Sequence, residues 1–132
     1  MKTLVFFCAA FAFTIAGAAP AASAHDTGLS QPHAACMDKS GGTTLGMIEC
    51  ITAETQRQDA RLNKAYKSLM AGLAPPRKAQ LQEAQRAWLK YRDANCGFYA
   101  DPEGGSLARV NANDCVMTTT ADRARELESF TQ

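Results

Sequence analysis

Histidine is scarce in this chain of 132 residues, with only His25 and His33 near the N-terminus. We expect both to lie in a flexible leader, whereas a general base has to be held within hydrogen-bond reach of the proton it removes. Serine–histidine and cysteine–histidine catalysis therefore lack their base. Glu49 and Glu54 are five residues apart and point to different faces of a helix, so a hydrolase that uses these acids is the least favoured alternative. Phosphate-binding glycine loops and calcium-loop spacings are absent, and we predict a non-enzyme without cofactor.

The chain also lacks an excess of charge of either sign, with 14 Lys and Arg against 13 Asp and Glu. Nucleic-acid binding depends on many cationic contacts to phosphate, so this balance argues against a nucleic-acid partner. The charges are unevenly distributed, however. Residues 57–92 carry nine basic and two acidic residues, whereas residues 93–132 carry three basic and seven acidic ones. A surface polarised in this way can steer a charged protein partner.

Long apolar runs are missing everywhere except at the N-terminus. There, Lys2 precedes the uncharged apolar stretch 4–19, and Ala22-Ser23-Ala24 has the small-x-small pattern that signal peptidase cleaves. We predict a signal peptide over residues 1–24 and a mature chain that begins at His25. No other stretch approaches the roughly 18 apolar residues that a membrane span needs.

The fifth cysteine, Cys8, lies inside this signal sequence and would be removed with it. Because Val5, Phe6 and Phe7 precede it, it lacks the Leu-small-small context of a lipidation site. We therefore expect a periplasmic or secreted protein that is soluble after removal of the signal peptide, without a membrane span.

Removing 24 of the 132 residues leaves 108, which is enough for one domain. Residues 25–35 contain Gly, Ser, Pro, His and Gln with a single large apolar residue, Leu29, and we interpret them as a flexible leader. Residues 36–132 are then the folded domain.

The domain retains four cysteines and no Cys-x-x-Cys pair. In an oxidising compartment an even number of cysteines indicates disulfides, and the missing motif argues against a zinc site or redox catalysis. We favour the local pairing, Cys36 with Cys50 and Cys96 with Cys115. The crossed pairing stays open, since a helical hairpin brings Cys50 to the level of Cys96. Each bond contributes about 3 kcal/mol.

Apolar residues recur at intervals of three and four and never alternate, which predicts an all-α fold without strands. We expect a small antiparallel bundle of three main helices. The first starts at residues 43–44, and the second starts at Pro76 and ends before 100–105. The third starts with Ser106 as its cap. The threonine run 118–120 leaves a kink or a split open, because β-branched residues are restricted in helices. The expected inward positions are Ile48, Ile51, Thr55, Leu62, Tyr66, Leu69 and Leu73; Leu81, Gln85, Trp88, Arg92, Cys96 and Tyr99; and Leu107, Val110, Cys115, Thr119, Arg123, Leu127 and Phe130.

Polar residues on these inner faces predict a structural hydrogen-bond network. It consists of Asp59, Asn63, Gln85 and Arg92. A buried arginine is costly unless it is paired, so we expect Arg92 to meet Asp59 or Glu49 across the hairpin. Gln85 is expected to hydrogen-bond to backbone or to Asn63.

Three sequence patterns stand out along the predicted helices. They are Asp59-x-x-Leu62-Asn63-x-x-Tyr66; Gln85-Arg86-x-Trp88-Leu89-x-Tyr91-Arg92-Asp93-x-x-Cys96; and Cys115 followed by Thr120-x-x-Arg123-x-x-Glu126-Leu127. Together they resemble the N-terminal domain of LprI-type lysozyme inhibitors. The resemblance extends over about residues 36–127. It implies a small exported helical domain with cysteine pairs that binds and inhibits lysozyme. The family is named after a lipoprotein, and this chain differs in lacking the lipidation cysteine.

We predict a periplasmic protein-binding module that blocks the active-site cleft of lysozyme-type muramidases. Lysozymes work with two carboxylates in a cleft, so a cation or hydrogen-bond donor placed there would inhibit them. The candidate contact residues are basic side chains at helical spacing, namely Arg57, Arg61, Lys64, Arg86 and Lys90. The alternative is an envelope structural or stress-related protein-interaction domain that does not inhibit lysozyme.

Overall fold

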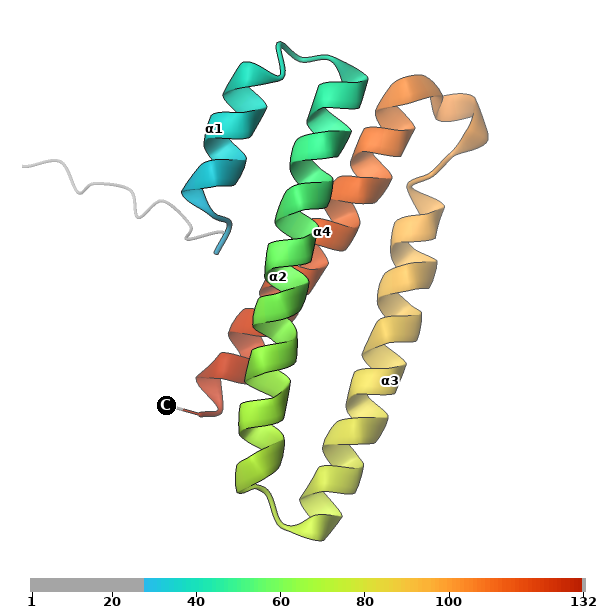
Figure 1. The fold of residues 1–132 in the computed structure, drawn as a ribbon. Coiled ribbons are helices and arrows are strands. Elements are labelled where there is room, and N and C mark those ends of the chain that lie inside the picture. The colour runs from blue at the N-terminus through green and yellow to red at the C-terminus, as the bar shows by residue number, and fades with distance from the viewer. Residues whose placement is uncertain (1–27, 132) are drawn as a thin grey trace, which may run out of the picture.

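Over residues 28–131, the part of the chain that the computed structural model describes, the protein is almost entirely helical (Figure 1). The elements are α1 (Gln31–Lys39), α2 (Thr44–Gly72), α3 (Pro75–Phe98), the 3-10 turn η1 (Pro102–Gly104) and α4 (Gly105–Ser129). The predicted all-α bundle with three long helices is confirmed, and α1 is an additional short helix. The predicted signal peptide and residues 25–27 lie outside the described residues.

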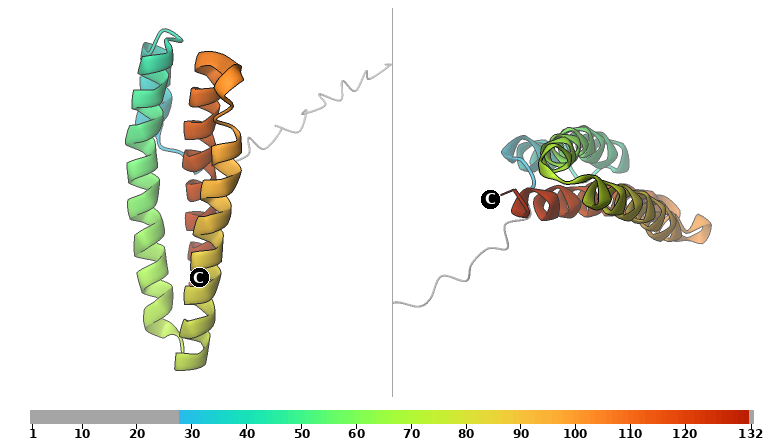
Figure 2. Two further views of the ribbon diagram at one scale, coloured as in Figure 1. Left: turned by 90° about the vertical axis from the view of Figure 1, so that its right-hand side faces the viewer. Right: turned by 90° about the horizontal axis from the view of Figure 1, so that it is seen from below.

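The long helices form a layered bundle rather than a simple hairpin with a third helix at its side. α2 and α3 run antiparallel, and α4 passes behind them in the same direction as α2 (Figures 1 and 2). α2 packs chiefly against α4, and α3 also packs against α4. α1 lies beside the first half of α2, on the side away from α3 (Figure 1). Within residues 28–131, no helix is long and apolar enough to cross a membrane.

The boundaries of α2 and α3 follow from capping and proline. The Thr43 hydroxyl accepts a hydrogen bond from the Gly46 amide at 3.3 Å and begins α2. Leu73 and Ala74 are extended, and for Ala74 the reason is that a residue before proline is disfavoured in the helical conformation. α3 therefore starts at Pro75, one residue earlier than expected, since the first of the two prolines already fits the first helical position.

α4 differs from its prediction at the start and in its continuity. It begins at Gly105, which has a φ of +64°, and Ser106 lies inside the helix, so its expected role as the cap is wrong. The threonine run 118–120 is fully helical. The Thr118 hydroxyl donates to the backbone carbonyl of Asp114 at 2.9 Å, and this satisfies the polar group of a residue that is otherwise unfavourable in a helix.

The core lies between α2 and α4 and has two parts. One contains Leu62, Ala65, Ala124 and Leu127, and the other contains Ile51, Val110 and Met117. The alanines of α4 lack bulk and so allow the backbones of α2 and α4 to approach closely. The expected inward positions Leu107 and Phe130 are instead exposed, because the buried face of α4 is centred on its alanines. Tyr99, also expected to point inward, is exposed because it lies just past the end of α3.

Both disulfides join residues that are close in sequence. Cys36 is bonded to Cys50 and Cys96 to Cys115, with Cα–Cα distances of 5.6 and 5.4 Å. The favoured local pairing is confirmed, and the crossed pairing and a four-cysteine zinc site are excluded. One bond attaches α1 to α2, and the other attaches the end of α3 to α4.

The first helix contradicts the expectation that residues 25–35 form a flexible leader. Residues 31–35 belong to α1. The Ser30 hydroxyl caps this helix by accepting from the His33 amide at 3.3 Å, and Pro32 lies at a position where a missing amide costs nothing. The disulfide of Cys36 then holds the helix against α2.

Candidate partner-binding site

Arg61, the central member of the predicted basic face on α2, makes hydrogen bonds within the protein itself. Its Nε and Nη2 donate to the two carboxylate oxygens of Glu128 at 2.7 and 2.6 Å, and its Nη1 donates to the Gly28 carbonyl at 3.2 Å. These hydrogen bonds lower the pKa of Glu128, against the opposing effect of burial, and the charge of Lys64 adds to the lowering. Arg61 therefore joins α2 to the end of α4 and to the segment before α1.

Its neighbour Arg57 is also engaged, as one donor to the buried carboxylate of Glu54. This carboxylate accepts from the Ser30 amide and hydroxyl at 2.8 and 2.5 Å, from Arg57 Nε at 2.7 Å and from Gln58 Nε2 at 2.7 Å. Burial by itself raises the pKa of Glu54, but hydrogen bonds from the Ser30 hydroxyl, Gln58, Arg57 and the Ser30 amide lower it to about 2. A general acid needs a raised pKa, so this carboxylate is suited to structure rather than to hydrolysis.

This structural role of Glu54 was not identified from the sequence. The signal was present, because Glu54 lies three residues after Ile51 and four before Gln58, on one buried face of α2. The carboxylate has no exposed surface, and a buried carboxylate needs hydrogen-bond donors around it. We call the group formed by Ser30, Glu54, Arg57, Gln58 and Arg61 the N-terminal clamp.

Arg92 does not meet Asp59 or Glu49, and that prediction is wrong. It donates to the carboxylate of Asp93 at 2.8 and 3.0 Å and to the Thr120 hydroxyl at 3.4 Å. The reason is that Arg92 faces α4, whereas the prediction placed it opposite α2. Asp59 instead accepts a 3.4 Å hydrogen bond from Asn63 on its own helix.

Gln85 also has a partner on α4 rather than the expected backbone or Asn63. Its Oε1 accepts from Arg123 Nε at 3.0 Å. The guanidinium carbons of Arg92 and Arg123 lie 5.2 and 5.9 Å from the centre of the Trp88 ring. Trp88 is therefore in cation–π contact with Arg92 of its own helix and with Arg123 of α4, and the second contact attaches the middle of α3 to α4.

The exposed basic residues of α3 remain as candidates for partner contact. Arg86 lines a groove of about 400 Å³ between α2 and α3. Its walls include Asp59, Asn63, Tyr66, Gln82, Arg86 and Leu89. Lys90 is exposed one helical turn beyond Arg86. Both side chains carry a charge at the surface, next to polar donors and the half-exposed Leu89.

The structure does not unite the two predicted basic faces. Arg61 and Lys64 line a different hollow, next to Glu128 at the end of α4, whereas Arg86 lines the α2–α3 groove. Arg57 and Arg61 serve the N-terminal clamp. Of the five predicted contact residues, Arg86 and Lys90 are thus the pair best placed to meet a partner.

Comparison with known proteins agrees with this architecture. The sequence model described as "Lysozyme inhibitor LprI" matches residues 36–127, which include both disulfides and nearly all of the bundle. An uncharacterized protein, R02472, from Rhizobium meliloti (strain 1021) is 31% identical over 97 residues, which cover 61% of this chain and 68% of the relative. No solved structure matches the chain significantly. The extent of the family match over the disulfide-linked bundle shows that the chain belongs to the lysozyme inhibitor LprI family.

Proposed function

We propose that the protein is exported and inhibits lysozyme-type muramidases by placing the α2–α3 groove over their active-site cleft. The observation that supports this most strongly is the exposed position of Arg86 at the groove, in a chain of the LprI family. Arg86 is exposed, and it forms no ion pair with any residue among 28–131. Its guanidinium is available to a partner, unlike those of Arg57 and Arg61.

The chemistry of the target suits this cation. Lysozymes hydrolyse glycosidic bonds with two carboxyl groups in one cleft. An arginine can bind a carboxylate through two parallel hydrogen bonds, which gives both affinity and a defined orientation. In the proposed complex Arg86 meets these carboxyl groups, Lys90 adds charge at the rim, and Asn63 and Gln82 supply further hydrogen bonds.

The charge distribution also favours a defined approach. All nine basic residues between 57 and 92 lie on α2 and α3, whereas α4 carries four acidic and three basic residues. A molecule with an unevenly distributed positive charge is oriented in the field of a charged partner before contact. The acidic cleft of a muramidase would attract the α3 side first.

A cell-wall lysis assay tests the proposal. The disulfide-bonded mature protein, predicted to begin at residue 25, is titrated against several classes of lysozyme. We expect stoichiometric loss of lysis with at least one class. The Arg86→Glu variant should raise the concentration needed for half inhibition at least about tenfold, because a reversed charge would face the target's carboxylates. Lys90→Glu should have a smaller effect, as expected for a charge at the rim.

The matched control is Arg109→Glu, which reverses an exposed arginine on α4 outside the groove. It should leave inhibition unchanged. Equal effects of the Arg86 and Arg109 variants would contradict the proposed surface and indicate a general effect of charge. Failure of the folded protein to inhibit any class would contradict inhibition itself and favour the alternative, an envelope protein-interaction domain.

A further inference from the structure

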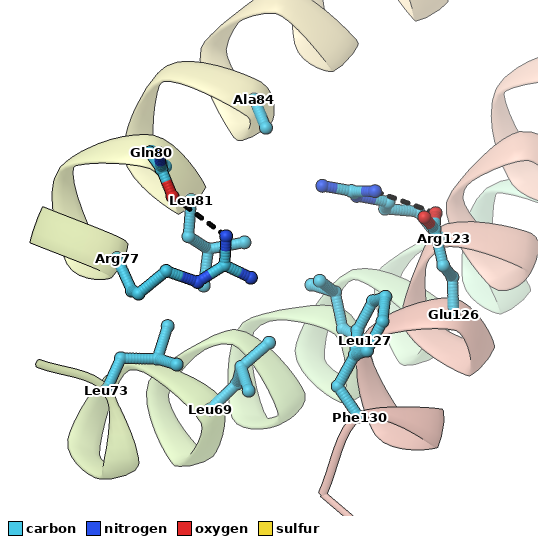
Figure 3. Close-up of a pocket in the computed structure, with 10 residues that line it drawn as sticks. All are labelled: Leu69, Leu73, Arg77, Gln80, Leu81, Ala84, Arg123, Glu126, Leu127 and Phe130. Atoms are coloured by element: carbon cyan, nitrogen blue, oxygen red, sulfur yellow. Dashed lines mark hydrogen bonds and ion pairs between the residues drawn. The ribbon is translucent and has the colours of Figure 1, made fainter.

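A further hollow lies next to the α2–α3 groove, at the end of the bundle where the turn between α2 and α3 meets the end of α4 (Figure 3). Its volume is about 440 Å³, which falls within the range of about 300–1,000 Å³ typical of small-molecule sites. All three long helices contribute to it. Its apolar lining consists of Leu69, Leu73, Leu81, Ala84, Leu127 and Phe130. We call it the leucine hollow.

Two arginines project into this apolar space from opposite sides. Arg77 comes from the first turn of α3 and Arg123 from α4, and their guanidinium groups both extend into the space between these helices (Figure 3). Arg77 donates to Gln80 at 2.8 Å, and Arg123 donates to Gln85 at 3.0 Å and to Glu126 at 2.7 Å. Glu126 is the one carboxylate that lines the hollow, and the ion pair with Arg123 neutralises it. The net charge of the hollow is therefore set by Arg77.

The position of Arg77 adds to this positive field. The start of a helix carries a partial positive charge, and a basic side chain in the first turn increases it rather than compensating it. No acidic residue lies in the first turn of α3. An anion in front of Arg77 would therefore be favoured both by the guanidinium and by the helix. The apolar side chains below it would favour a hydrocarbon rather than a compact polar anion.

From this combination we propose that the leucine hollow binds a single-chain amphiphile with an anionic head group. The hydrocarbon chain lies over Leu69, Leu73, Leu81 and Phe130, and the head group lies between Arg77 and Arg123. Apolar surface that is now in contact with water would be buried, which provides the driving force. The two arginines would select an anionic head group over a cationic one. A fatty carboxylate and an alkyl phosphate share this chemistry.

The chain carries its own reporter for the test. Trp88 is the single tryptophan, and it contacts the guanidinium of Arg123. A head group that draws Arg123 into the hollow changes the environment of the indole and hence its fluorescence. The disulfide-bonded protein is titrated with decanoate, decyl phosphate and decyltrimethylammonium below their micelle concentrations. Equilibrium dialysis measures binding independently of the fluorescence.

We expect saturable binding of one or both anionic probes, with a dissociation constant between about 10 µM and about 1 mM for an open site of this size. The cationic probe should bind at least about tenfold more weakly. A preference for decanoate or for decyl phosphate identifies which anionic head group the site accepts.

Two substitutions locate the site. Arg77→Gln should weaken the anionic probes about tenfold, since it removes a charged hydrogen-bond donor from an exposed side chain without disturbing the core. Phe130→Ser should weaken all probes about fivefold through lost apolar contact. Arg109→Gln, the charge-matched control on α4, should change nothing.

The proposal is overturned if no probe binds saturably, if the cationic probe binds as well as the anionic ones, or if Arg77→Gln behaves like Arg109→Gln. Circular dichroism and the melting temperature verify that each variant is folded. Because the leucine hollow and the α2–α3 groove have different linings, loss of one activity is distinguishable from loss of the other.

Discussion

The interface between α2 and α4 and the attachment of α3 are built in different ways. The α2–α4 interface buries large apolar side chains completely, with Ile51, Met117 and Leu127 at 1% exposure or less. α3 has 24 residues, and only Gln85 and Cys96 are buried among them. Leu81 and Trp88 are partly buried against the core. Hydrophobic burial therefore holds α2 to α4, whereas a disulfide and polar contacts hold much of α3.

This difference distinguishes the α2–α4 interface, which acts as the scaffold, from α3, which provides exposed surface. A helix that buries few of its side chains keeps most of them available to a partner. Both proposed sites lie along α3, because the α2–α3 groove and the leucine hollow are each lined by one of its faces. The α2–α4 interface supplies the rigid support that a binding surface needs.

The largest effect is expected in the α2–α4 interface. Leu127→Ala should lower the free energy of unfolding by about 4 kcal/mol, because Leu127 is fully buried and its loss leaves a cavity between the helices. Urea denaturation measures this change in the free energy of unfolding. Leu89→Ala on α3 is the matched control, since this leucine is 38% exposed, and it should cost less than about 1 kcal/mol. Equal costs at both positions would contradict the distinction between the two regions.

Removal of the α3 disulfide should have the next largest effect. The double substitution Cys96→Ser and Cys115→Ser should destabilise the protein by about 3 kcal/mol, because the bond closes a loop with a sequence separation of 19. Hydrogen exchange sharpens the comparison. Amides in the last turns of α3 should exchange faster, while those of Leu62 and Ala124 in the α2–α4 core should lose less protection. Uniform loss of protection would mean that α3 and the interface unfold as one unit.

The N-terminal clamp should contribute a comparable amount and should depend on pH. The pKa of Glu54 is about 2 in the folded protein and 4.5 without these contacts, so the folded state favours the carboxylate. Its contribution, on the order of 3 kcal/mol, is present above pH 4.5 and is lost as the pH falls toward 2. Glu54→Gln should lower stability at pH 7 and flatten the acid limb of the stability curve.

Glu49→Gln is the control for this prediction. Glu49 is an exposed carboxylate on the same helix, five residues earlier, and its substitution should change stability by less than about 0.5 kcal/mol. Urea denaturation from pH 7 to pH 2.5 gives both curves. An unchanged acid limb in the Glu54 variant would show that its carboxylate does not govern acid unfolding.

The smallest effect is expected for the cation–π contacts of α3. In a double-mutant cycle, Trp88→Leu and Arg92→Gln should show a coupling energy of about 0.5–1 kcal/mol, because the guanidinium lies 5.2 Å from the ring centre and is partly exposed. The pair Trp88→Leu and Lys90→Gln should show no coupling. A coupling energy above about 2 kcal/mol between Trp88 and Arg92 would mean that this contact is one of the main contributions to the stability of the fold.

The sequence alone determined the class of fold, most helix boundaries and the disulfide cysteines. Intervals of three and four reveal an amphipathic helix directly, and proline and glycine end helices through local geometry that no distant contact has to supply. The local pairing of the cysteines was favoured for a similar reason, although the crossed pairing was excluded only by the structure. Ser106 does not cap α4, because Gly105 begins this helix without a side-chain cap.

Only the tertiary structure decided which face meets which helix. Periodicity places Arg92 and Gln85 on one face of α3, but it does not say that this face turns toward Thr120 and Arg123 on α4. The N-terminal clamp depends in the same way on the contact of Ser30 with Glu54, 24 residues apart, and Arg61 takes a further partner, Glu128, from the end of α4. Charged and polar side chains take their partners from whatever packing brings near, because their pairing has no period along the chain. The roles of Glu54, Arg57 and Arg61 were therefore decided by packing, whereas the helices that carry them could be predicted from the sequence.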